Sequence, residues 1–130
     1  MKKILAVFAA VAVTAVMTAC SSIEVANTFN DVKITGEPNA NCVEHLNADI
    51  WGIYLFNVPL FSGSSKQPGR CALFTDTVRV DNAVSMLTRK AASDRATTIV
   101  DLSSERTSCW IPILLVLWYN DVQVSGNAVR

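Results

Sequence analysis

Three cysteines and the single histidine of this chain are the side chains best suited to bind a metal ion. Cys42 and His45 stand in a Cys-x-x-His spacing, and Cys71 and Cys109 would complete a set of three thiolates and one imidazole for zinc. The chain has no second close pair of ligands, however, and thiols outside the cytosol tend to oxidise. We therefore predict no metal site and keep Cys42 and His45 as the alternative ligands.

The groups needed for covalent catalysis do not form a recognisable set. A nucleophile must lie beside a base and an orienting group, yet His45 is the only histidine and no Gly-x-Ser-x-Gly motif is present. The glycine-containing segment 63–70 does not match a phosphate-binding loop. We predict that the protein is not an enzyme.

Four aromatic residues are candidates for stacking on sugars or lipids. Trp51, Trp110, Trp118 and Tyr119 all stand in apolar segments, where such side chains more often belong to the core. Trp118 and Tyr119 are the two that we expect at the surface, because apolar and polar residues begin to alternate there.

Length and composition limit the fold to one domain. The chain has 130 residues, of which 51% are hydrophobic and 17% are charged, and its 11 basic residues balance 11 acidic ones. That length supports one hydrophobic core, and the composition is not that of a disordered chain. Because there is no net positive charge to recruit nucleic acid, we expect no nucleic-acid partner.

The first residues have the pattern of a secretory signal. Lys2 and Lys3 precede an apolar run over residues 4–16. The run is shorter than the ~20 apolar residues of a bilayer-spanning helix, and no stop-transfer pattern follows it. We predict a signal peptide over residues 1–19.

The end of this signal, MTAC at residues 17–20, resembles the lipobox of bacterial lipoproteins. The resemblance implies cleavage before Cys20, diacylglycerol on its thiol and an acyl chain on its new α-amino group. Two or three acyl chains anchor a protein stably, whereas one gives only about 10⁴ M⁻¹. Ser21 and Ser22 resemble the class sorted to the outer membrane. The alternative is an ordinary cleaved signal with a chance cysteine.

The segment after the signal is expected to be a tether. Residues 20–31 would comprise the lipidated Cys20 and a short linker, and ten flexible residues reach roughly 17 Å. A single domain over residues 32–130 would then lie close to the membrane. The expected location is the cell envelope, at the outer membrane and facing the periplasm.

Hydrophobic patterning predicts one helix and three strands. Apolar residues at helical spacing predict a helix over residues 80–91, with Asp81 as its N-cap. Aromatic and β-branched runs predict strands near residues 48–60, 97–103 and 110–128. Residues 103–108 are polar and are interpreted as a turn, and the last strand is expected to bend at residues 120–121.

This order predicts an α/β (α+β-like) fold class. A right-handed crossover through the helix would make the first two strands parallel, and the short turn would make the third antiparallel. The result would be a small two-layer domain of strand-helix-strand-strand order, with one helix packed on a mixed sheet.

Parts of the pattern resemble uncharacterised small lipoproteins of the TRL-like kind. The resemblance lies in Ala83, Leu87 and Ala91 of the helix, in ATTIVDL at 96–102 and in VSGNAV at 124–129. It covers about half of the chain. Asp94-Arg95 stand where such patterns usually carry a glycine that closes the helix, so the helix end is left open.

The cysteines predict one intramolecular disulfide. After lipidation of Cys20, three of the four cysteines remain, so at least one stays unpaired within the chain. The predicted topology puts Cys71 and Cys109 at one end of the sheet and Cys42 at the other, beyond the ~7 Å Cα separation that a disulfide allows. We predict Cys71–Cys109, with three reduced, buried thiols as the alternative.

Taken together, these features predict a membrane-anchored envelope lipoprotein without catalytic activity. It would bind an envelope protein or peptidoglycan, or support the membrane mechanically, and the covalent lipid on Cys20 would replace any cofactor. The alternative is a lipoprotein that binds a small ligand or a metal through Cys42 and His45 or through exposed aromatic residues.

Overall fold

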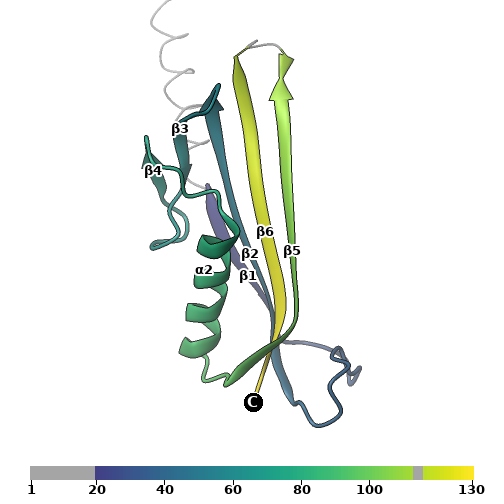
Figure 1. Cartoon of the computed structure of the whole chain (residues 1–130). Coiled ribbons are helices and arrows are strands. Elements are labelled where there is room, and N and C mark those ends of the chain that lie inside the picture. The colour runs from purple at the N-terminus through teal and green to yellow at the C-terminus, as the bar shows by residue number, and fades with distance from the viewer. Residues whose placement is uncertain (1–19, 113–115) are drawn as a thin grey trace, which may run out of the picture.

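The computed structural model describes residues 20–112 and 116–130. The predicted signal peptide and residues 113–115 lie outside the described residues. In chain order, the elements are β1 (Ser21–Ala26), β2 (Cys42–Leu55), β3 (Val58–Gly63), β4 (Cys71–Leu73), α2 (Val80–Ser93), β5 (Thr98–Ile111) and β6 (Leu117–Val129). Figure 1 shows long, twisted strands with α2 lying against the lower half of one side.

The strands of the described chain form one sheet in the order β4-β3-β2-β6-β5. Every pairing is antiparallel, and β1 joins the edge of β2 below the segment that pairs with β3. The segment predicted as a flexible tether is therefore partly wrong, because residues 21–26 form a strand that is bonded along β2.

The predicted α/β fold class and its mixed sheet are wrong. The protein is mostly β, with a six-stranded antiparallel sheet and one short helix. The helix does connect two strands that run in the same direction, β4 and β5, but β3, β2 and β6 lie between them in the sheet. Local patterning cannot reveal this, because the insertion of β6 depends on contacts between distant segments.

The strand predicted over residues 48–60 is two strands of a hairpin. The chain turns at Phe56, which has a positive φ of 52°, and Asn57 completes the turn. Asn57 is the one polar residue between the apolar runs at 53–56 and 58–61, so the sequence pattern indicates a single strand instead of two. Pro59 lies beside a register shift between Ile53 and Tyr54, where a missing N–H is tolerated.

The polar segment 103–108 is the middle of β5, so the predicted turn there is wrong. Both faces of this edge strand are exposed, which is why it carries serine, threonine and charged residues. The register shifts between Val100 and Ser103, next to Asp101 at a positive φ of 54°. The strand β5 continues to Ile111, and the predicted bend at residues 120–121 is regular strand within β6.

The helix is confirmed and extends to Ser93. Ala83, Leu87 and Ala91 of the predicted apolar stripe are buried. Asp81 is not the N-cap; that position is Arg79, and the two side chains form an exposed ion pair at 3.1 Å. Asp94 ends the helix and Arg95 follows with a φ of 62°, the left-handed conformation for which glycine is favoured at this position.

The core lies between α2 and one face of the sheet. Even-numbered residues of β2 and β6 point toward the helix because side chains alternate along a strand. Their odd-numbered neighbours form the opposite side, which α2 does not cover and which we name the open face (Figure 1). The buried side chains on the helix side include Leu46, Ala48, Ile50, Val122, Val124 and Ala128, which pack against Met86 and Leu87.

Candidate functional site

Cys20 is the first described residue and is fixed at the edge of the sheet. It is fully buried, and its Sγ is bonded to Sγ of Cys71, with 5.6 Å between the Cα atoms. Its backbone oxygen accepts a hydrogen bond from the Trp51 N–H at 3.0 Å. The residue predicted to carry lipid thus lies beside Trp51 of β2, five residues before the turn at Phe56.

The predicted Cys71–Cys109 disulfide is not formed, and Cys71 pairs with Cys20 instead. Cys71 lies on β4 and Cys109 on β5, which are the opposite edges of the sheet. Four strand spacings separate them, about 19 Å at the usual 4.8 Å, which no disulfide spans. Cys42 and Cys109 are free thiols, and Cys109 is exposed.

His45 takes part in a structural hydrogen-bond network. Its Nδ1 lies 2.7 Å from Oδ1 of Asn127. The Asn127 side-chain nitrogen donates to the Ile34 oxygen at 3.1 Å and to Oδ2 of Asp101 at 2.9 Å. Because both donated bonds occupy the amide nitrogen, the Asn127 oxygen is the acceptor and His45 is the donor. This network ties the loop after β1 to β2, β5 and β6.

Cys42 lies at the start of β2, and burial raises the pKa of its thiol. Neither Cys71 nor Cys109 lies near Cys42 and His45, so the full zinc set considered from the sequence is not assembled. Among the described residues, no group of three or more His, Cys, Asp or Glu side chains is arranged to hold a metal ion.

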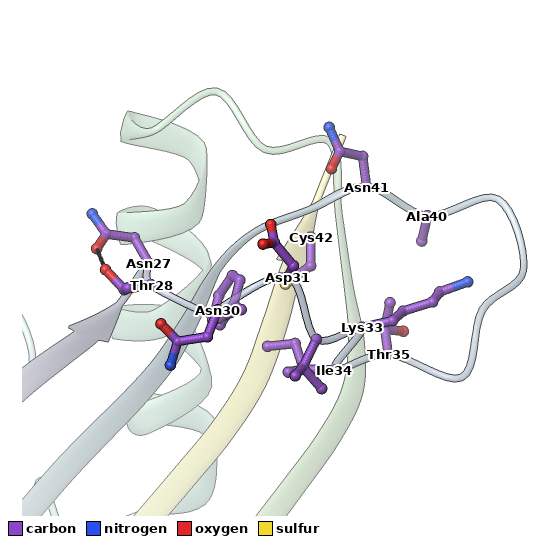
Figure 2. Close-up of a pocket in the computed structure, with 12 residues that line it drawn as sticks. Asn27, Thr28, Asn30, Asp31, Lys33, Ile34, Thr35, Ala40, Asn41 and Cys42 are labelled. Carbon is purple, nitrogen blue, oxygen red and sulfur yellow. Dashed lines mark hydrogen bonds between the residues drawn. The ribbon is translucent and has the colours of Figure 1, made fainter.

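A hollow in the described chain lies under the loop that joins β1 to β2. It has a volume of about 750 Å³ and is lined by residues 27–35 and 40–42 (Figure 2). Nearly all of its lining belongs to that one loop, and Cys42 is the one predicted ligand residue in it. The hollow therefore has no set of converging groups from different elements.

A strip of carboxyl groups and aromatic rings crosses the middle of the open face. Asp49 and Trp51 of β2 lie diagonally beside Asp121 and Tyr119 of β6, because Trp51 pairs with Asp121. The rings of Trp51 and Tyr119 have centroids 5.7 Å apart, and Phe61 packs edge-on against Trp51 at 6.0 Å. We name these five residues the acidic-aromatic strip.

Electrostatics set the two carboxyls of the strip apart from surface aspartates. The Oδ1 atoms of Asp49 and Asp121 are buried without a hydrogen-bond partner in the described part of the chain. Burial and the neighbouring Asp121 carboxyl raise the pKa of Asp49 to about 7. Burial also raises the pKa of Tyr119. A carboxyl with the pKa of Asp49 is partly protonated near neutral pH, and unpaired carboxyl oxygens accept hydrogen bonds from hydroxyl or amide groups.

The sequence interpretation found only part of this strip. Trp51 was assigned to the core and is half-buried on the open face, and Tyr119 is half-buried as well. Trp110, also assigned to the core, is 44% exposed, while Trp118 is 40% exposed as expected. Asp49 and Asp121 were missed, although the alternation Asn47, Asp49, Trp51 already puts polar residues on one face of β2.

The raised pKa of Asp49 predicts a pH-dependent stability. Its pKa in the native state lies above the unfolded value of ~3.9. The native state therefore holds more protons between about pH 4 and 7, and stability falls as the pH rises through this window. The wild type should therefore lose stability between pH 5 and pH 8, and Asp49→Asn should lose less, by on the order of 1 kcal/mol in the free energy of unfolding. The difference is this small because solvent screens the half-exposed carboxyl.

Urea unfolding at pH 5 and pH 8 measures this effect. Asp31→Asn, in an exposed loop, is the matched control and should behave like the wild type at both values. If Asp49→Asn keeps the same loss of stability between the two pH values as the wild type, another group is responsible.

Comparison with known protein families, with characterised proteins and with solved structures finds no match for this chain. Within the described residues, no helix is long and apolar enough to cross a membrane.

Proposed function

We propose that the protein is a cell-envelope lipoprotein, anchored to the outer membrane by lipid on Cys20, with a non-catalytic binding or structural role. The MTAC motif at residues 17–20, behind a basic and apolar leader, is the observation that carries the proposal. A second feature supports it: β1 begins at Ser21. A lipid on Cys20 would therefore hold the edge of the sheet directly at the membrane.

Lipidation and the disulfide with Cys71 exclude each other because both use the Cys20 sulfur. A thioether to diacylglycerol on Cys20 would leave the Cys71 sulfur as a thiol, in a residue whose Cα atom lies 5.6 Å from that of Cys20. In the lipidated protein, Cys42, Cys71 and Cys109 would all react with an alkylating reagent. In the disulfide form, only Cys42 and Cys109 would react. The number of free thiols therefore distinguishes the two forms.

The acidic-aromatic strip supplies a surface for the binding role. Aromatic rings stack with their faces on the apolar faces of sugars, and the neighbouring carboxyls accept hydrogen bonds from hydroxyl and amide groups. Peptidoglycan presents both kinds of group, and so does the surface of an envelope protein. The strip lies on the face that α2 leaves uncovered, so either partner would meet it without rearrangement of the sheet.

The full chain expressed in a bacterium with a lipoprotein-processing pathway tests the proposal. Mass spectrometry of the purified protein should find Cys20 at the N-terminus with diacylglycerol and an acyl chain attached. Alkylation under denaturing, non-reducing conditions should modify three cysteines. A product without lipid, with two reactive cysteines and a Cys20–Cys71 cross-linked peptide, would refute lipid anchoring.

Two variants complete the test. Cys20→Ala should leave an unprocessed precursor, because the sulfur that receives the lipid is absent. Cys71→Ala is the matched control: it removes the other partner of the disulfide but should keep the lipid and the membrane fraction unchanged. Loss of membrane attachment in both variants would point to folding rather than to lipidation.

A further inference from the structure

We propose that the end of the sheet near Phe56 inserts into the surface of a lipid bilayer. This inference rests on the proposed function only in naming the membrane to which Cys20 anchors the chain. The inserting end, which we name the apolar tip, consists of large apolar side chains at the ends of two hairpins and of β4. Its exposed residues are Leu55 (36%), Phe56 (63%), Val58 (56%), Leu73 (57%), Phe74 (74%), Trp110 (44%) and Trp118 (40%).

The tip is formed by two hairpins that meet at the same end of the sheet. Figure 1 shows the turn between β2 and β3 beside the ends of β5 and β6. The Phe56 N–H donates to the Val116 oxygen at 2.9 Å, which joins the turn at Phe56 to the residue that precedes β6. Such pairing matters because an unsatisfied backbone group costs several kcal/mol in an apolar medium.

Charge is absent from both hairpin ends. No Asp, Glu, Lys or Arg occurs in residues 50–65 or in residues 107–120. A water-exposed hairpin turn normally carries polar residues, as the loop over residues 64–70 of this chain does. Beside this end, the carboxylate of Asp76 accepts a hydrogen bond from the Tyr54 hydroxyl at 2.6 Å. The concentration of exposed apolar surface at the hairpin ends marks a binding surface rather than scattered exposure.

Tryptophan composition identifies the partner as a bilayer. Trp110 and Trp118 are cross-strand partners, so their two exposed rings form a row across β5 and β6. Tyr54 of β2 pairs with Trp118, but its ring is buried in the core. The helix begins at Val80 and lies against the lower half of the sheet, away from the end where β5 stops and β6 starts (Figure 1). Tryptophan and tyrosine prefer the membrane–water interface because their rings are apolar with one polar group.

The position of Cys20 agrees with this assignment. Its backbone oxygen is bonded to Trp51, three residues below Tyr54 on β2. At ~3.3 Å per residue, the row of rings lies about 10 Å beyond Cys20 along the strands. Interfacial elements typically penetrate about 5–10 Å. With lipid on Cys20 at the headgroup level, the tip would therefore reach the boundary of the acyl chains.

Quenching of tryptophan fluorescence by brominated lipids tests the inference. The mature lipoprotein is reconstituted into phosphatidylethanolamine–phosphatidylglycerol vesicles with brominated acyl chains. The double variant Trp51→Phe, Trp118→Phe retains only Trp110, and Trp110→Phe, Trp118→Phe retains only Trp51 as the control. We expect at least twofold stronger quenching of Trp110 than of Trp51. Equal quenching would overturn the inference.

The same measurement separates this inference from the lipid anchor. A chain made without residues 1–19 and with Cys20→Ser carries no lipid, and its Trp110 should still be quenched by added vesicles, less so after Phe56→Ser. If mass spectrometry finds no lipid on Cys20 but Trp110 is quenched, the proposed lipid anchor is refuted, whereas the insertion of the apolar tip is supported. The alternative occupant of the tip is a second copy of the chain. In that case the protein would be a dimer in solution and vesicles would not quench Trp110, and this result would overturn insertion.

Discussion

Gly63→Ala is expected to lower the free energy of unfolding by about 3 kcal/mol and to displace the start of β1. A Cβ at this position would lie 1.9 Å from the backbone oxygen of Cys20 and 2.7 Å from Cβ of Ser21. Backbone cannot rotate away as a side chain can. Overpacking costs ~1–3 kcal/mol, and the hydrogen bonds that Cys20 and Ser21 make to Trp51 and Gly69 would each lose about 1 kcal/mol.

Chemical denaturation of the two proteins measures this cost. Gly36→Ala is the matched control, because a Cβ there meets no atom within 4 Å, and its stability should change by less than ~0.5 kcal/mol. Hydrogen exchange at the Trp51 amide should accelerate only in Gly63→Ala. Similar stability for both variants would mean that Cys20 does not lie against β3.

Leu87→Ala is expected to lower the free energy of unfolding by ~2–5 kcal/mol. Leu87 is fully buried and belongs to the core cluster formed by α2 and the helix side of β2 and β6. Truncation removes apolar contacts and leaves a cavity between α2 and the sheet. The long paired strands of the sheet cannot move far enough to close this cavity. The spread in the expected cost reflects how far the helix can move toward the sheet.

Val80→Ala on the same helix is the control for this prediction. Val80 is 39% exposed at the first turn, so the loss of its methyl groups should cost less than ~0.5 kcal/mol. Equilibrium unfolding in urea, followed by circular dichroism, compares both variants with the wild type. A Leu87→Ala protein as stable as Val80→Ala would show that this face of α2 is not packed on the sheet.

The candidate site illustrates what a linear sequence conveys about a surface. The alternation Asn47, Asp49, Trp51 is visible in the sequence, so one polar face of β2 could be inferred. Asp49 and Asp121, however, lie diagonally beside each other across β2 and β6 although they are far apart along the chain. Their proximity depends on the register between β2 and β6, and a shift by one residue would turn every side chain to the other face.

The cysteines show the same limit. Assigning Cys71 to Cys109 required a strand order, and the predicted order put both at one end of a three-stranded sheet. In the folded chain β3 and β4 extend one edge while β5 forms the other, so Cys71 is brought to Cys20 instead. The predicted tether concealed this neighbour, because residues 21–26 look too short and mixed to count as a strand until β2 is there to pair with them.

The sequence by itself determined the features that depend on nearby residues. The helix over Val80–Ser93 follows from apolar spacing at 3.6 residues per turn, and the motif at residues 17–20 is read directly from four adjacent side chains. Only the tertiary structure decided that β6 lies between β2 and β5, that the open face carries the acidic-aromatic strip, and that two hairpins bring their apolar ends together. The physical reason is that strand pairing forms hydrogen bonds between distant segments, whose partners are selected by the packing of the whole sheet rather than by local conformational preference.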